Sequence, residues 1–193
     1  MDFYDVIEKR RSIRVCKQGA TEEQLRKIII AGTKAPSAVN RQPWEFIIVD
    51  DQMLIEQLAE LKYQLNIKKD PDHGDMTDKE RERRALRQKR YFRNASVVAV
   101  CNEIEWERSV WLSIENMSLA AVAEGLGSCI VLLWGEEKVK AEELIGLPEN
   151  YELTALLKIG VPGEKGFTRD KNPFGPRRAE FSWLHKNRFG NVD

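Results

Sequence analysis

Apolar side chains recur along this chain in two different periods, and the two periods alternate. The helical period is clear from 52 to 65 and from 110 to 125, whereas short β-branched runs such as EFIIV at 45–49 are typical of strands. We expect helices over 2–11, 22–35, 52–65, 110–125 and 138–145, and strands over 45–49, 96–101, 129–133 and 153–159.

The ends of several helices carry residues that start or stop helices. Thr21 and Gln24 have the spacing of a capping box, Pro36 ends the same helix, and Gly125 stands where a helix C-terminus favours glycine. The helices differ in length and the chain ends in a Gly- and Pro-rich tail, which together predict an α+β fold with a sheet of about four strands wrapped by helices. The length of 193 residues favours a single domain over 1–193.

Residues 66–93 form a charged helical insertion. A turn at 70–74 precedes a helix with few apolar positions, so we expect this segment to stay outside the core. Three roles stay open: a solvated helix held by i, i+4 pairs of Glu and Arg, a mobile cover over an active site, or an arm that binds nucleic acid. The acidic residues at 70–82 count against the third role.

Charge and composition exclude several classes of partner. Lys plus Arg and Asp plus Glu number 31 each, so no net field favours nucleic acid or an anionic membrane. The chain has no apolar run of membrane-spanning length and its N-terminus has no signal-peptide pattern, so we expect a cytoplasmic protein. The widely spaced Cys16, Cys101 and Cys129 predict buried free thiols, and two histidines without clustered cysteines predict no metal site.

Two clusters of arginine suit an anionic ligand. RRSIR at 10–14 combines three guanidinium groups with Ser12, a set that suits a phosphate or a ring carbonyl, although a basic helix C-terminus facing the helix dipole is an equal alternative. GPRRAEF at 175–181 places Arg177 and Arg178 near the C-terminus. Each cluster is a weak signal alone, but the two could converge on one phosphate.

A third segment, APSAVNRQPW at 35–44, brackets short polar residues between two prolines directly before a strand. The prolines restrict the backbone, while Ser37, Asn40 and Gln42 present donors and acceptors for a polyhydroxyl chain or the edge of a heterocycle. A plain polar loop leading into a strand is the alternative.

Taken together, these segments resemble the FMN-dependent nitroreductase family. The landmarks follow that family's order over most of the chain: RRSIR at 10–14, APSAVNRQPWEFIIV at 35–49, WLSIENMSLAAVAEGLGSCIVLLWG at 111–135 and PRRAEFSWLHKNRFG at 176–190. Their combination is far more specific than any one of them. The resemblance implies an intertwined homodimer, with a central, mostly antiparallel sheet in each subunit and one FMN in each of two interface clefts.

The resemblance also implies which residues bind FMN. The phosphate and the pyrimidine side of the ring would be held by Arg10, Arg11, Ser12 and Arg14. The phosphate would be closed off by Arg177 and Arg178. The partner subunit would bring to the ribityl chain and ring Pro36, Ser37, Ala38, Asn40 and Gln42. The pyrimidine edge would meet Gln88.

The same resemblance places a final set against the flavin: Leu132, Leu133 and Trp134. Relatives often carry glycines or a Glu-Gly pair there. This departure puts in doubt the usual hydrogen bonding near the flavin N5.

In such an enzyme the chemistry takes place on the flavin and needs no catalytic side chain. We expect a ping-pong mechanism in which NADH or NADPH reduces the flavin and leaves, after which a small electron-poor acceptor, such as a nitroaromatic, a quinone or an enone, takes its place. Basic groups near the pyrimidine edge would favour the reduced flavin. Two alternatives stay open: a specialised reductase of the same fold, such as a reductive dehalogenase, and a non-catalytic flavin-binding or interaction protein.

Overall fold

The structure is a computed structural model that describes residues 1–68, 76–163, 178, 179 and 182–191. Its elements follow the chain in the order α1 (Phe3–Lys9), β1 (Cys16–Gly19), α2 (Glu22–Gly32), the 3₁₀ turn η1 (Ala38–Asn40), β2 (Trp44–Val49), α3 (Gln52–Ile67), α4 (Asp78–Arg90), β3 (Ser96–Glu103), α5 (Glu107–Ala123), β4 (Gly127–Val131), α6 (Gly135–Leu144) and β5 (Tyr151–Pro162). Among the helices of these residues, none has the length and apolar character needed to cross a membrane.

The 12-residue strand β5 organises the sheet, because it pairs antiparallel with β1, β3 and β4. The remaining strand, β2, pairs antiparallel with β3. Gly160 of β5 faces Gly19 of β1 and Gly127 of β4. A Cβ atom at Gly160 would lie 2.5 Å from the carbonyl oxygen of Gln18, so the close approach of the strands here requires glycine.

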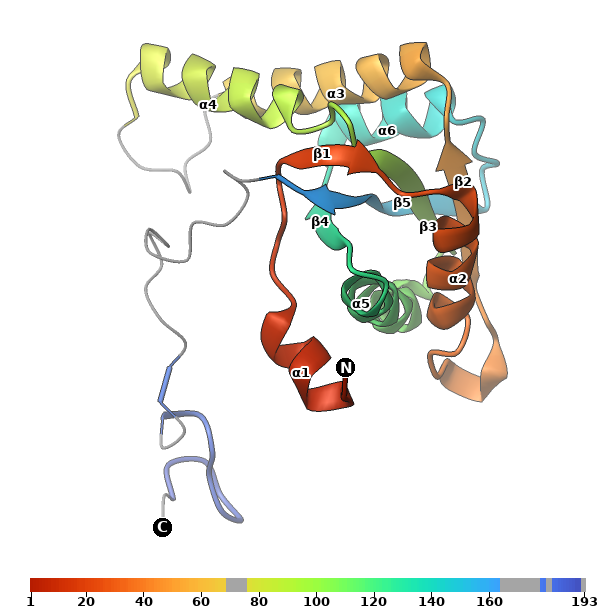
Figure 1. Cartoon of the computed structure of the whole chain (residues 1–193), viewed down its shortest axis with the longest axis vertical. Coiled ribbons are helices and arrows are strands. Elements are labelled where there is room, and N and C mark those ends of the chain that lie inside the picture. Colours follow the sequence, from red (N-terminus) through yellow and green to blue (C-terminus); the bar gives the residue numbers. More distant parts are fainter. Residues whose placement is uncertain (69–75, 164–177, 180–181, 192–193) are drawn as a thin grey trace.

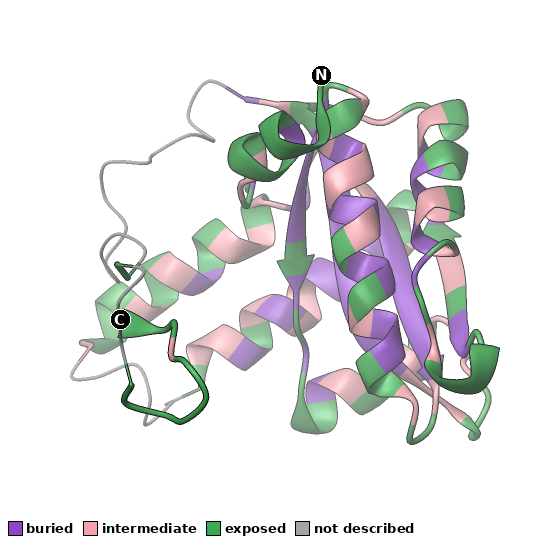
Figure 2. Ribbon diagram, turned by 90° about the horizontal axis from the view of Figure 1, so that it is seen from below, coloured by how far each residue is buried: buried purple, intermediate pink, exposed green. Residues whose placement is uncertain are grey.

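Helices cover both faces of the sheet, with α3, α4 and α6 on one side and α2 and α5 on the other (Figure 1). Successive strand residues point to opposite faces. Accordingly, Val98 and Val100 pack in the core with α2 and α5, whereas Val97 and Ala99 pack in the core with α3 and α6. Figure 2 shows buried residues along the strands and on the inner faces of the helices, and exposed residues over most of α1.

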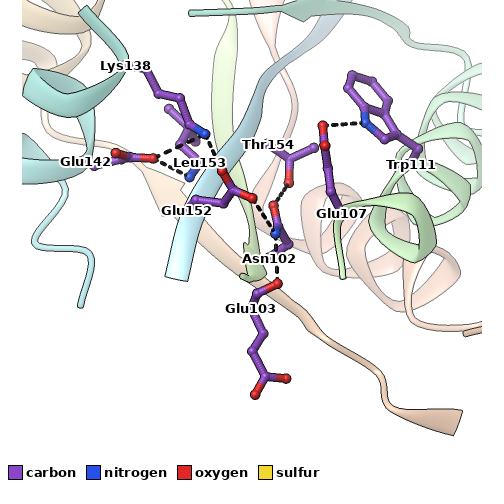
Figure 3. Close-up of polar contacts among 9 residues, drawn as sticks. All are labelled: Asn102, Glu103, Glu107, Trp111, Lys138, Glu142, Glu152, Leu153 and Thr154. Atoms are coloured by element: carbon purple, nitrogen blue, oxygen red, sulfur yellow. Dashed lines mark hydrogen bonds and ion pairs between the residues drawn. The ribbon is translucent and has the colours of Figure 1, made fainter. Parts of the chain in front are cut away.

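A network of polar side chains lies where β3 ends and β5 begins (Figure 3). Asn102 is fully buried, accepts a 2.6 Å hydrogen bond from the Thr154 hydroxyl and donates one of 3.0 Å to Glu152. Lys138 of α6 lies 2.5 Å from Glu152 and 3.7 Å from Glu142. The network therefore joins opposite charges and satisfies the buried amide, as a buried polar group requires.

The expected α+β fold with an antiparallel sheet is confirmed, and so are the capping box at Thr21 and the positive φ of Gly125 after α5. The three cysteines are buried and free, as expected. The sheet has five strands, and one of them, β1, was not predicted. Only one of the four residues of β1, Cys16, is buried, so no apolar run marked the strand.

Two further expectations need correction. The strand expected at 129–133 is shifted, since β4 spans Gly127–Val131 and leaves Leu132 and Leu133 in the connection to α6. The charged segment 66–93 was expected to stay outside the core, but Ala85 and Phe92 are fully buried, with exposures of 0% and 3%. Two well-placed apolar residues are enough for α4 to dock, because its other side chains can stay in water.

Candidate functional site

The segment 10–14, which we call the arginine arm, is fixed to the start of β4. Ser12 forms a parallel bridge with Ser128, and the amide of Ile13 donates a 2.8 Å hydrogen bond to the Ser128 carbonyl. Ile13 is buried, and a Cβ atom at Gly127 would lie only 2.2 Å from its side chain. The glycine therefore allows the arm to dock on the edge of the sheet.

The side chains of the arginine arm keep much of their binding capacity. Arg10 pairs with Glu115 of α5 at 3.6 Å, and Arg11 reaches Glu8 at 3.9 Å. Both distances are long for a hydrogen-bonded ion pair, and ion pairs that are this exposed contribute little to the stability of the fold. Ser12 and Arg14 are exposed. The arm thus presents three guanidinium groups and a hydroxyl within five residues, which suits a phosphate.

A buried lysine joins the arginine arm to the end of α4. The ammonium of Lys158, on β5, donates to the carbonyl of Tyr91 at 2.7 Å and to that of Arg14 at 3.4 Å. Tyr91 follows α4 directly and lies three residues after Gln88. Through Lys158 the structure therefore links Arg14, at the end of the arm, to the end of α4 that carries Gln88.

A second buried lysine holds the connection between β4 and α6. The ammonium of Lys62, on α3, donates to the carbonyl of Leu132 at 2.9 Å and lies 4.9 Å from the centre of the Trp134 ring. Leu133 packs into the core below α3 and α6. Leu132 and Trp134, by contrast, are 41% and 49% exposed, so they offer an apolar surface to a planar ligand.

The two lysines make this part of the molecule locally positive. Burial lowers the pKa of Lys62 to about 8, and Arg84 acts in the same direction. Burial also lowers the pKa of Lys158, and Arg14 contributes. In the described part of the chain, no carboxylate forms an ion pair with either lysine. An anionic ligand would therefore be favoured on this side of the sheet.

The proline-bracketed loop lies elsewhere. The amide of Ala38 donates a 3.4 Å hydrogen bond to Ser109 in the first turn of α5, whereas the arginine arm docks on β4 just after α5 ends. The arm also meets α5 at Glu115, six residues beyond Ser109, through the ion pair of Arg10. Among the described residues of one chain, no hydrogen bond or ion pair joins the arm to Pro36, Ser37, Ala38, Asn40 or Gln42.

The loop nevertheless has a defined shape. The Ser37 hydroxyl accepts a 3.0 Å hydrogen bond from the amide of Gln42, and Arg41 forms a two-point ion pair with Glu103 at the end of β3. Asn40 and Gln42 have positive φ angles of 55° and 52°. Asparagine tolerates this left-handed conformation better than most residues, whereas glutamine adopts it at a cost. The hydrogen bond from the Gln42 amide to Ser37 helps to hold the loop in this conformation.

The role expected of the C-terminal arginines stays a prediction. Arg177 lies outside the described residues. Arg178 is exposed, and its carbonyl accepts a 3.2 Å hydrogen bond from the Trp183 indole. No group of three His, Cys, Asp or Glu residues that could hold a metal occurs in the described ranges.

Sequence reasoning missed the two lysines. Each stands inside an apolar stretch, LAELKYQL on α3 and TALLKIG on β5, and a charged residue in such a stretch was the available signal. In both stretches the other residues alone give the apolar pattern of a helix or a strand. The stretches were therefore assigned to the core without attention to the lysine.

Comparisons with known proteins agree on one family. The sequence model of the Nitroreductase family matches residues 7–161. The chain is 31% identical over 186 residues to an Archaeoglobus fulgidus protein named "Putative NADH dehydrogenase/NAD(P)H nitroreductase", covering 90% of this chain and 93% of that protein. It is 27% identical over 173 residues to an iodotyrosine deiodinase of Thermotoga neapolitana, covering 84% and 89%. A crystal structure of iodotyrosine deiodinase bound to FMN and 3-iodo-L-tyrosine superposes with a TM-score of 0.77 at 26% identity, covering 97% of this chain and all of that one.

Proposed function

Because the chain belongs to the nitroreductase family, we propose that it is an FMN-dependent oxidoreductase, which passes electrons from NADH or NADPH through bound flavin to a small electron-poor acceptor. The observation that carries the proposal is the convergence of the arginine arm, the end of α4 and the segment 132–134 around two buried, positively charged lysines. The region around the lysines combines anion-binding groups with an exposed apolar surface.

These residues fit the chemistry of FMN, which has a dianionic phosphate, a polar pyrimidine edge and a flat ring. We assign the phosphate to Arg10, Arg11 and Ser12, and the pyrimidine side to Arg14 and Gln88. Leu132 and Trp134 supply exposed apolar surface for the ring. When bound, FMN accepts a hydride from the nicotinamide and returns electrons to the acceptor. The side chains bind and orient the cofactor and need supply no nucleophile.

We further propose that the working unit is a homodimer. Large apolar side chains are exposed on α1 and on the adjoining α5: Phe3, Tyr4, Ile7 and Leu112. Large apolar side chains exposed on neighbouring helices are a feature of interfaces. Among the described residues, no hydrogen bond or ion pair joins the loop 36–42 to the arm of its own chain. A second copy would bring this loop, with Ser37, Asn40 and Gln42, to the flavin.

A second candidate function is reductive dehalogenation of a halogenated phenol. The similarity to an iodotyrosine deiodinase in sequence, and to the FMN- and iodotyrosine-bound enzyme in structure, favours it. Both functions use the same fold and flavin, so they differ in the acceptor that the cleft admits.

The test is an absorption spectrum of the purified protein after incubation with FMN, recorded anaerobically before and after addition of NADH or NADPH. We expect a flavin spectrum that bleaches with the nicotinamide and returns when a nitroaromatic, a quinone or an enone is added. Return of the spectrum with 3-iodotyrosine alone would favour the dehalogenase. Bound flavin that neither nicotinamide reduces would refute the reductase and support a non-catalytic flavoprotein.

A further inference from the structure

Lys62 and Lys158, which we call the inner lysines, are buried on the face of the sheet covered by α3, α4 and α6. Lys158 is 1% exposed and Lys62 is 9% exposed. Lys158 pairs directly across the strands with Cys129 of β4, and the Cys129 thiol influences the pKa of both lysines. The two ammonium groups therefore occupy one region beneath β4.

The contacts of the inner lysines are with backbone carbonyls and aromatic rings. Lys158 donates to Arg14 and Tyr91, and its ammonium lies 5.3 Å from the ring centres of both Tyr91 and Phe92. Lys62 donates to Leu132 and faces Trp134. Each carbonyl belongs to a segment to which we assign a flavin contact. The lysines thus tie the walls of the proposed site to the core.

Carbonyls and rings compensate a buried charge only in part. Desolvation of an ammonium group costs several kcal/mol in real proteins, and an apolar residue of similar size would avoid that cost. Arg84 and Arg14 add further positive charge near the two groups. The inner lysines therefore destabilise the isolated chain electrostatically, and a negative charge brought into the site would relieve this.

We propose that the inner lysines are positioning residues that favour the reduced form of bound FMN over the oxidised form. The inference rests on the proposed function. A hydride adds two electrons and one proton to the ring, so reduced FMN carries one more negative charge until it takes up a second proton. Positive charges in a region of low dielectric stabilise that added charge. The lysines contact the segments that we assign to the flavin and not the flavin itself. Their charge should therefore change the cofactor's redox equilibrium.

The experiment measures the midpoint potential of bound FMN in the wild-type protein and in Lys62→Gln, by anaerobic equilibration with a reference dye. Glutamine retains a donor for the Leu132 carbonyl and removes the charge. We expect the affinity for reduced FMN, relative to oxidised FMN, to fall about tenfold, which lowers the potential by about 30 mV for a two-electron couple. Lys140→Gln, an exposed lysine on α6, is the matched control and should leave the potential unchanged.

The potential separates the proposal from a purely structural role, since damage to the fold would weaken both redox forms alike and leave their ratio unchanged. If Lys62→Gln does not fold, Lys158→Met is measured in its place, with the same expected direction. A wild-type potential in the folded variant overturns this inference and leaves the proposed function standing. A wild-type protein that binds no FMN overturns both.

Discussion

Two buried polar regions pack against the same sheet, and they differ in whether their charged groups are paired. They are the network at Asn102 and the inner lysines. The network at Asn102 pairs Lys138 with Glu152 and Glu142, and every charged group in it has a partner of opposite sign (Figure 3). Lys158 lies six residues beyond Glu152 on β5, about 20 Å away. Neither it nor Lys62 has a carboxylate partner among the described residues.

The difference separates a structural role from a functional one. A paired and hydrogen-bonded network is self-sufficient, and removing one member leaves the others unsatisfied. Buried cations without a counter-charge are an unfavourable feature of the isolated fold, and such features concentrate at sites that bind ligands. The first region should therefore control stability, and the second should control the affinity for an anionic cofactor.

The largest expected effect is on stability at the network. Asn102→Ala removes the acceptor of the Thr154 hydroxyl and a donor to Glu152 at a fully buried position, so we expect a loss of about 2 to 4 kcal/mol in the free energy of unfolding. Urea unfolding of the apoprotein measures it, with the exposed Asn150→Ala as control. The FMN affinity of the folded variant should stay within about twofold; a large loss of affinity would erase the distinction between the regions.

At the arginine arm we expect the reverse pattern, a loss of FMN affinity with little change in stability. Arg10→Ala should weaken FMN binding by about 10- to 30-fold, or roughly 2 kcal/mol, because a charge-assisted contact to the phosphate is lost. Its effect on unfolding should be small, because Arg10 meets Glu115 only at 3.6 Å. A titration of flavin fluorescence gives the affinity, and Arg26→Ala on α2 is the control. Undiminished flavin occupancy after dialysis would count against the phosphate role.

The sequence predicted one of these regions better than the other. The arginine arm was recognisable, because RRSIR gathers several chemistry-bearing residues in a family landmark. Asn102 and the inner lysines were not, because they interrupt apolar strands and helices whose periodicity survives them. Their meaning depends on partners 50 or more residues away, such as Glu152 for Asn102 and Leu132 for Lys62, and local patterns do not encode such contacts.

The same limit applied to the fold. Strands with continuous apolar runs, such as β2 and β3, could be placed within a few residues. The edge strand β1 has one buried residue, and its pairing depends on the close approach of Gly19 and Gly160. The loop 36–42 was identified from its prolines, but its contacts with Glu103 and Ser109 are more than 60 residues away in the sequence and could not be.

A smaller effect should appear in the pH dependence of stability. The pKa of Lys62 is about 8 in the folded chain and near 10.5 when unfolded, so the unfolded state binds more protons between these values. The folded state then becomes more stable as the pH rises through this window. Relative to Lys62→Met, the wild type should gain roughly 1 to 2 kcal/mol from pH 7 to pH 10. The check is the urea concentration at the midpoint of unfolding, measured for both proteins from pH 7 to pH 10. If the difference between the two midpoints does not change with pH, Lys62 is not buried as a cation.

The stability of the network should depend on pH in the acid range. Hydrogen bonds from Lys138 and Asn102 hold the pKa of Glu152 below its usual value of 4.5. The stability that Glu152 contributes is therefore present above pH 4.5 and is lost as the pH falls through its lowered pKa. Thermal melts of wild type and Glu152→Gln should converge toward low pH; a constant difference between them would show that the charge of Glu152 is not involved.

The smallest effect is expected at an exposed contact beside the network. Glu107 accepts a 2.9 Å hydrogen bond from the Trp111 indole within α5, at an exposed position (Figure 3). Glu107→Gln retains an acceptor, so the free energy of unfolding should change by less than about 0.5 kcal/mol. A loss above 1 kcal/mol in urea unfolding would mean that the network extends to the helix surface.

The most direct measurement is a crystal structure of the protein with FMN. The account predicts a phosphate at Arg10 and Ser12, a ring against Leu132 and Trp134 above the inner lysines, and the loop 36–42 of a second subunit over the ribityl chain. An FMN bound away from the arginine arm, or a site completed within one chain, would contradict it.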